Sequence, residues 1–257
     1  MNTEGSDTGR LDGRVAVITG ASRGFGRATA TRFAAEGADI VVNYRAAEAE
    51  AREVVAEVER AGRRAVAVRA DIGAAADCAA LAAAALAAFG RVDVLVNNAG
   101  IMDVRPFADQ GPADWEAMLD VNVWGTLRLT HALLPALRSS GRGRVINLSS
   151  QLGHVGGENF AVYAGTKGFI LAYTKSLARE VGPDGVTVNA ICPGSVITDM
   201  NRGIYPPDVA AVRARALPLR HMGDPDDIAA AAVYLASDDA RFMTGQCVDV
   251  NGGSTMA

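Results

Sequence analysis

Short runs rich in β-branched residues alternate with longer stretches of helical spacing along most of the chain. We interpret the short runs as buried strands, at residues 15–19, 40–43, 65–68, 92–96, 144–148, 186–191 and 247–250. The helical stretches lie at residues 24–36, 46–61, 74–88, 113–138, 159–181 and 225–236. Parallel strands need long crossover connections, and helices supply these on both faces of a sheet. The alternation therefore predicts a doubly wound α/β fold with a parallel seven-stranded sheet.

No linker or change of composition divides the 257 residues, so we expect a single domain over residues 11–257. Residues 1–10 are polar and lack the apolar core of a signal peptide, which favours a disordered lead-in. Residues 200–222 break the rhythm, with one glycine and three prolines around a short charged helix. Irregular segments of this length are often lids over a site.

The composition excludes several classes of protein. With 49% hydrophobic and 21% charged residues, the chain is typical of a packed globular protein. A net charge of −4 attracts neither nucleic acid nor anionic lipid, and the longest uncharged runs are too short to span a membrane. The three cysteines are far apart, and so are His131, His154 and His221. These spacings predict no disulfide framework and no metal site, and they favour a reducing cytoplasm.

A glycine-rich turn follows the first expected strand, where residues 19–26 read TGASRGFG and a helical pattern begins. Glycine lets the backbone approach a pyrophosphate closely, and the start of a helix offers free amide hydrogens and a partial positive charge. The spacing is not the common G-x-G-x-x-G, and a tight turn without a ligand is the alternative interpretation.

Four further motifs follow in order. They are NNAG at residues 97–100, Ser150 thirteen residues before Tyr163, Tyr163-x-x-x-Lys167, and Pro193-Gly194. Together with the glycine turn, they resemble the short-chain dehydrogenase/reductase family over residues 11–257. The resemblance implies a Rossmann-like fold and an NAD(P)-dependent oxidoreductase. The ending VNGG at residues 250–253 further resembles the 3-oxoacyl-[acyl-carrier-protein] reductase branch.

Tyr163 and Lys167 are four residues apart in a helical stretch, so both side chains project from one helix face. Proton exchange by tyrosine near neutral pH requires its pKa to fall by roughly 3 units from about 10, and a nearby ammonium favours that shift. The chain uses only two lysines, Lys167 and Lys175, although arginine is abundant. A lysine at position 167 therefore looks required, while a solvated i,i+4 pair with Tyr163 is the alternative.

The family likeness implies two further catalytic residues. Ser150 is expected to hydrogen-bond the reacting oxygen, and Ser149 is its competitor from sequence alone. Asn122 matches the residue that holds a water linking Lys167 to solvent, and an exposed polar position is the alternative.

The cofactor is expected along the ends of the first strands. An acidic residue at the end of the second strand selects NAD, but this strand ends with Tyr44, and Arg23 and Arg45 are placed to hold a 2′-phosphate. NADP(H) is therefore favoured, and NAD(H) is the alternative. By resemblance, the remaining contacts are Gly20, Ser22, Gly24, Phe25, Gly26, Asp71, Ile72, Asn98, Ala99, Gly100, Tyr163, Lys167, Pro193, Gly194, Val196 and Thr198. Asn97 is interpreted equally well as a tie between strands.

These observations predict an NADP(H)-dependent enzyme that interconverts a ketone and a secondary alcohol. A 3-oxoacyl-[acyl-carrier-protein] reductase is the first alternative, and a non-catalytic dinucleotide-binding sensor is the second. Asp184 stands where many carrier-protein reductases have a basic residue, which disfavours an acidic carrier at the active-site mouth. The apolar residues of 113–138 are spread around more of the helix surface than one sheet can cover, which suggests a second face buried against a partner helix. We therefore expect a homotetramer, with a dimer as the next possibility.

Overall fold

The computed structural model describes residues 9–256, and the strands in this range form one parallel sheet in the order β3-β2-β1-β4-β5-β6-β7. The strands are β1 (Val15–Ile18), β2 (Asp39–Tyr44), β3 (Ala65–Arg69), β4 (Val94–Asn97), β5 (Arg144–Leu148), β6 (Thr187–Pro193) and β7 (Cys247–Val250). Each lies within two residues of its expected bounds, so the predicted α/β fold is confirmed. The division into a lead-in at 1–10 and a domain at 11–257 stays a prediction, and it falls partly outside the described residues.

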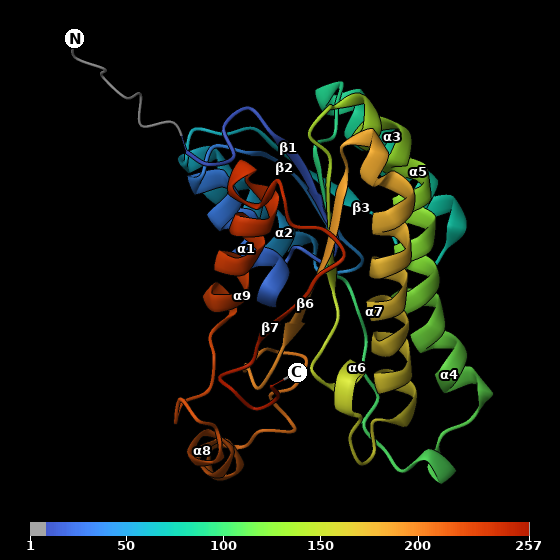
Figure 1. The fold of residues 1–257 in the computed structure, drawn as a ribbon, viewed down its shortest axis with the longest axis vertical. Coiled ribbons are helices and arrows are strands. Elements are labelled where there is room, and N and C mark those ends of the chain that lie inside the picture. Colours follow the sequence, from blue (N-terminus) through green and yellow to red (C-terminus); the bar gives the residue numbers. More distant parts are fainter. Residues whose placement is uncertain (1–8, 257) are drawn as a thin grey trace.

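Helices cover both faces of the sheet (Figure 1). One face carries α1 (Gly24–Ala35), α2 (Glu48–Arg60) and α9 (Pro225–Ala236), and the other carries α3 (Ala75–Phe89), α5 (Thr126–Ser139) and α7 (Ala161–Val181). A separate apolar cluster fills each interface. Ile18, Ile40 and Phe33 belong to the first cluster, whereas Leu95 and Leu129 belong to the second. The strands read as nearly continuous apolar runs because both of their faces are buried.

The helical stretch expected at residues 113–138 is helical throughout, but it is not one regular α-helix. The structure has α4 (Pro112–Leu119), one π-helical turn (η2, Asp120–Gly125) and then α5. The wider turn directs the buried Asn122 side chain toward the backbone of Ile101, where it makes two hydrogen bonds. Gly125 lies against Ile72, so close that a β-carbon at residue 125 would come within 2.8 Å of that side chain. Such π-turns are frequent at functional sites.

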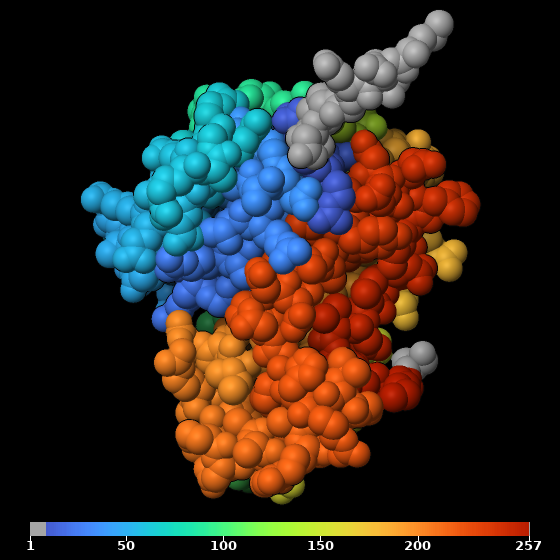
Figure 2. All heavy atoms as spheres, turned by 90° about the vertical axis from the view of Figure 1, so that its left-hand side faces the viewer, coloured from blue at the N-terminus to red at the C-terminus, as the bar shows by residue number. Residues whose placement is uncertain are grey.

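The segment at 200–222 contains the expected short helix, α8 (Pro207–Ala216). Figure 2 shows this orange part of the chain as a lobe below α1 and α9. A second short helix, α6 (Leu152–Val155), follows β5, and single 3₁₀ turns lie at η1 (Phe107–Asp109), η3 (Gly182–Asp184) and η4 (Asp238–Ala240). Among the described residues, no helix is both long and apolar enough to cross a membrane.

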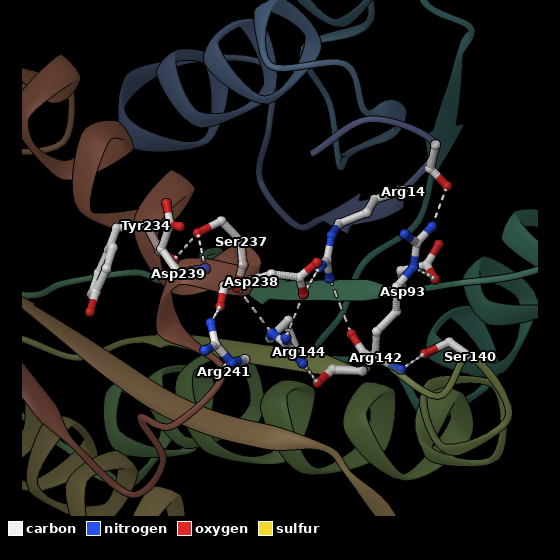
Figure 3. Close-up of polar contacts among 12 residues, drawn as sticks. Arg14, Asp93, Ser140, Arg142, Arg144, Tyr234, Ser237, Asp238, Asp239 and Arg241 are labelled. Atoms are coloured by element: carbon white, nitrogen blue, oxygen red, sulfur yellow. Dashed lines mark hydrogen bonds and ion pairs between the residues drawn. The ribbon is translucent and has the colours of Figure 1, made fainter. Parts of the chain in front are cut away.

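A cluster of arginines and aspartates joins the N-terminal ends of β1 and β5 to η4 (Figure 3). Arg14 and Arg144 are almost completely buried, and both donate to one carboxylate oxygen of Asp238. Arg14 also donates to the main-chain oxygen of Arg142 at 3.2 Å. Buried guanidinium groups are stable only where their charge and their donors are satisfied. Asp238 supplies the shared negative charge, and main-chain oxygens accept from other donors of both arginines.

Candidate functional site

A cavity of about 560 Å³ opens at the C-terminal ends of β1, β2, β3 and β4. Thirteen of the predicted cofactor contacts line it: Gly20, Ser22, Arg23, Gly24, Phe25, Tyr44, Arg45, Asp71, Ile72, Asn98, Ala99, Gly100 and Thr198. Loops at the C-terminal ends of parallel strands meet at one edge of the sheet, which explains why residues so far apart in sequence share one cavity.

The glycine turn between β1 and α1 has the backbone geometry that only glycine adopts easily. Gly20 and Gly24 have φ angles of +61° and +55°. Gly26 lies outside the cavity lining, and its role is close packing, because a β-carbon there would come within 2.3 Å of the Gly20 oxygen. Arg23 is the N-cap of α1, and no side chain within residues 9–256 caps that end. The first amides of α1 are therefore free of a side-chain acceptor beside the cavity.

Three polar side chains hold the glycine turn in place. The Thr19 hydroxyl accepts hydrogen bonds from the amides of Asn98 and Ala99, at 3.0 and 2.9 Å. The side-chain amide of Asn98 donates in return to the main-chain oxygens of Thr19 and Gly20. The Asn43 side-chain oxygen accepts from the main-chain amide of Gly20 at 3.2 Å, and its side-chain nitrogen donates to the main-chain oxygen of Val68 on β3. Asn98 thus lines the cavity as predicted, but its amide donors are used by the turn.

At one end of the cavity, Tyr44 is buried while Arg45 is exposed. The Arg45 guanidinium lies 4.0 Å from a carboxylate oxygen of Asp71, whose other oxygen accepts from the Gly73 amide at 3.0 Å. Arg23 contributes a second guanidinium to the same cavity. The cavity is therefore lined by Tyr44 and Arg45 at the end of β2, by Arg23 from the glycine turn, and by the Asp71 carboxylate after β3.

The predicted catalytic side chains gather where β4 and β5 end. The Lys167 ammonium donates to the main-chain oxygen of Leu148 at 2.7 Å and lies 5.7 Å from the centre of the Tyr163 ring. Ser150 is buried, and its hydroxyl accepts from the Leu152 amide at 3.1 Å. Ser149 is committed elsewhere, because its hydroxyl donates to the Lys167 main-chain oxygen at 2.8 Å. Of the two serines, Ser150 therefore remains the candidate.

Burial sets the ionisation of this group. It raises the pKa of Tyr163 to about 12, while a hydrogen bond with Ser150 acts in the opposite direction. It lowers the pKa of Lys167 to about 8, which the nearby Cys192 opposes. The downward shift that we expected for the pKa of Tyr163 is therefore not found, because desolvation of the buried phenol outweighs the hydrogen bond with Ser150.

Asn122 is fully buried, so the alternative of an exposed polar position is wrong. Its side chain accepts from the Ile101 amide and donates to the Ile101 oxygen, both at 2.9 Å, and it also donates to Thr166 at 3.1 Å. These bonds fix the segment after Gly100. The predicted water between Asn122 and Lys167 stays a prediction.

Five other predicted contacts do not line the cavity: Tyr163, Lys167, Pro193, Gly194 and Val196. Gly194 instead packs tightly on Asn251. A β-carbon on residue 194 would lie only 2.5 Å from that side chain, so this contact requires a glycine. Val196 is a core residue, and the Pro193 oxygen accepts from the Gln151 amide at 3.0 Å. This segment carries the loop that follows Ser150.

Sequence reasoning missed Asn43 and the strand tie that runs through Asn147. Asn97 donates to Thr130 and Asn147, and Asn147 donates to Thr174, so one buried chain of hydrogen bonds joins α5, β4, β5 and α7. This agrees with the structural interpretation of Asn97. The available signal was an asparagine inside an otherwise apolar strand, which needs buried partners.

The position of Asp184 corrects one argument. Asp184 ends η3, before β6 begins, and therefore lies at the sheet edge opposite the cavity. Its carboxylate pairs with Arg138 at 2.7 Å. Within one chain, the Asp184 charge does not border the mouth of the site, and it cannot argue against a carrier protein there.

Comparisons with known proteins match nearly the whole chain. The family model described as Enoyl-(Acyl carrier protein) reductase matches residues 20–255. The 3beta-hydroxysteroid dehydrogenase 1 of Eggerthella lenta is 41% identical and covers 96% of this chain and 95% of its own. A 3-oxoacyl-[acyl-carrier-protein] reductase of Synechocystis is 38% identical, with coverages of 96% and 98%. The crystal structure of a blue fluorescent protein from a metagenomic library in complex with NADPH has a TM-score of 0.90 and 37% identity, and covers 96% and 100%.

Proposed function

Because the chain belongs to the short-chain dehydrogenase/reductase family, whose members act on CH–OH groups, we propose that it interconverts a ketone and a secondary alcohol with NADP(H). One observation carries the proposal. Gly100 lines the cavity, and a β-carbon there would lie 3.6 Å from the Lys167 ammonium and 3.3 Å from the Asn122 amide oxygen. Gly100 therefore stands between the cavity and the predicted catalytic group, and its lack of a side chain keeps the distance between the two short.

The residues present fit a dinucleotide. The uncapped start of α1 and the two positive-φ glycines form a turn that suits a pyrophosphate, and the cavity runs from this turn toward Gly100. Asn98, Gly100 and Lys167 would hold the nicotinamide ribose. When bound, the dinucleotide supplies or accepts the hydride.

The roles of the chain's own side chains follow from their positions. Tyr163, protonated at neutral pH, donates the proton to the carbonyl oxygen in reduction and removes it from the alcohol in oxidation. The Ser150 hydroxyl donates to the same oxygen and orients it. Lys167, near Tyr163, supplies the positive charge that favours the tyrosinate, and Asn122 holds the backbone after Gly100 in place.

Three observations support NADP(H) over NAD(H). The end of β2 carries Tyr44 in place of a carboxylate, two arginines line the same cavity, and one relative of known structure was crystallised with NADPH. The Asp71 carboxylate near Arg45 weakens the positive field, so the preference is expected to be clear without being absolute.

A homotetramer also belongs to the proposal. Trp124 is 49% exposed and Leu119 is 40% exposed beside the α4–α5 junction, and Phe169 on α7 is 37% exposed. On a different part of the surface, Phe242 is fully exposed and Tyr234 on α9 is 43% exposed. Two apolar faces of this kind are what a tetramer with twofold symmetry needs.

The first alternative is a 3-oxoacyl-[acyl-carrier-protein] reductase, which the similarity to the Synechocystis enzyme favours. The test compares kcat/KM for a 3-oxoacyl thioester on carrier protein with the same acyl group on a pantetheine mimic. We expect similar values for the two. A large preference for the carrier-bound form, lost with added salt, would assign the enzyme to this alternative.

The second alternative, a dinucleotide sensor, is separated from an enzyme by one comparison. NADPH consumption is measured with a panel of steroid, sugar, polyol and 3-oxoacyl ketones, in parallel with the thermal stabilisation that NADPH causes. We expect at least one ketone to be reduced. Stabilisation without any turnover across the panel would support the sensor and reject the proposed reaction. For the location we propose the reducing cytoplasm, on the odd number and wide spacing of the cysteines in the sequence.

A further inference from the structure

Three side chains that commonly bind metal ions converge beside the end of β6, although they come from three different elements. They are His154 on α6, Cys192 on β6 and Asp249 on β7. One ring nitrogen of His154, the Cys192 sulfur and one carboxylate oxygen of Asp249 all lie within 4.8 Å of one another. Cys192 and Asp249 are direct partners in the β6–β7 pairing, so their side chains leave the sheet on the same face.

The Asp249 carboxylate is incompletely satisfied. Its Oδ1 atom is buried and has no hydrogen-bond partner in the described part of the chain. The His154 Nε2 atom lies 3.8 Å from it, beyond hydrogen-bond distance. A buried carboxylate oxygen without a donor is costly, because it has lost its hydration and gained nothing in return. A cation at this point would replace the missing donor.

We propose that His154, Cys192 and Asp249 form a binding site for a divalent transition-metal ion of the Zn²⁺ class. Zn²⁺ binds thiolate, imidazole and carboxylate at about 2.0–2.3 Å, so ligand atoms in a tetrahedral site lie roughly 3.3–3.8 Å apart. For a nitrogen and an oxygen ligand the expected separation is the shorter end, about 3.3 Å, so the 3.8 Å between His154 and Asp249 would have to shorten by about 0.5 Å on binding. Mg²⁺ and Ca²⁺ prefer all-oxygen sites and do not suit a thiol and an imidazole.

Burial of the three ligands indicates how the ion would reach the site. Cys192 is completely buried, whereas the side chains of His154 and Asp249 are 20% and 22% exposed. The ion would enter from the His154 side, and Cys192 would release its thiol proton on binding. Three protein ligands leave the fourth position to water. The bound ion would tie α6, just after Ser150, to the ends of β6 and β7.

The inference goes beyond the proposed function, and it can be tested without turnover. The full-length protein is stripped with a chelator and titrated with Co²⁺, whose thiolate complexes show a charge-transfer absorption in the near ultraviolet. We expect one equivalent to bind with that absorption and to be displaced by Zn²⁺. Cys192→Ser should remove the absorption, and His154→Ala and Asp249→Asn should each weaken Co²⁺ binding at least tenfold.

Cys78→Ser is the matched control, since Cys78 is an equally buried thiol on α3. It should leave the Co²⁺ spectrum unchanged. Thermal unfolding with and without Zn²⁺ gives an independent readout, because an ion that binds the folded state raises Tm. Zn²⁺ should raise the Tm of the wild type and of Cys78→Ser, whereas it should raise the Tm of His154→Ala and Asp249→Asn much less. A wild type without the absorption, or equal responses in all variants, would overturn the site.

Discussion

The Lys167 ammonium donates a hydrogen bond to the main-chain oxygen of Leu148 at 2.7 Å, with the Tyr163 ring centre 5.7 Å away. The last residue of β5 therefore holds the charge that the proposed reaction uses. Desolvation lowers the pKa of Lys167 from 10.5 to about 8, which means that folding buries a costly ammonium.

The first prediction is that Lys167→Met stabilises the fold and abolishes activity. A pKa about 2.5 units below its unfolded value costs roughly 3 kcal/mol, and losing the bond to Leu148 offsets about 1 kcal/mol. The free energy of unfolding at pH 7 should thus rise by about 2 kcal/mol. The folded-state pKa is lowered, so the cost is complete below pH 8 and absent above pH 10.5. Urea titrations at pH 7 and pH 10.5 should show this gain only at pH 7.

Lys167→Arg is the control for this prediction. A guanidinium stays charged when buried and has a different shape, so this variant should lose stability at both pH values. Equal stability of wild type and Lys167→Met at pH 7 would contradict the buried ammonium as a source of instability.

Tyr163→Phe is predicted to lower kcat by roughly 10²–10⁴-fold while NADPH affinity changes by no more than a few-fold, since only the proton donor is removed. Because burial raises the pKa of Tyr163 to about 12, its base form is scarce at neutral pH. Alcohol oxidation by the wild type should therefore rise with pH. Substantial residual reduction in the variant would reject Tyr163 as the acid, as would a pH-independent oxidation rate limited by chemistry.

NADPH is predicted to give a higher kcat/KM than NADH, and Tyr44→Asp should reverse the order. A carboxylate at the end of β2 repels a 2′-phosphate and accepts a hydrogen bond from a free 2′-hydroxyl. Tyr44→Phe should keep the wild-type preference. Since Tyr44 is buried in the core, Tm is measured alongside. Equal kcat/KM values for the two cofactors in the wild type would remove Arg23 and Arg45 as a phosphate clamp.

Light scattering at micromolar concentration should give the mass of a tetramer, and Trp124→Glu should reduce it to a dimer or monomer. The charge would have to be desolvated on the apolar face beside α4 and α5, where Trp124 is half-exposed. Val212→Glu on α8, at a residue that is 62% exposed, should keep the wild-type mass. A monomeric wild type would defeat the assembly proposal.

Asp238→Asn is predicted to lower the free energy of unfolding by about 2 kcal/mol. Two buried guanidiniums, Arg14 and Arg144, lose their shared carboxylate. Breaking a fully buried pair costs about 3–5 kcal/mol, and the 69% exposure of the Asp238 side chain reduces that figure. Asp239→Asn, on the next residue, should change stability little. If both variants unfold at the same urea concentration as the wild type, Asp238 does not stabilise the cluster.

The local pattern of the sequence determined the strand positions, the glycine turn and the common helix face of Tyr163 and Lys167. Each depends on neighbours a few residues apart: side-chain alternation, backbone conformations open mainly to glycine, and the helical repeat. The apolar strands alone imply a sheet buried on both faces, and this fixes where the C-terminal strand ends meet. Thirteen predicted cofactor contacts line one cavity for that reason.

Only the tertiary structure decided features that join distant segments. The π-turn at residues 120–125 accompanies the bonds between Asn122 and Ile101 across the fold, and no helical repeat predicts it. The same holds for the position of Asp184 opposite the cavity and for the pKa of Tyr163. Likewise, His154, Cys192 and Asp249 share no spacing in the chain and meet only because α6, β6 and β7 end at the same place. The pKa values of buried groups and the meeting of possible metal ligands depend on burial and on contacts between distant residues. The spacing of residues along one segment contains no information on either.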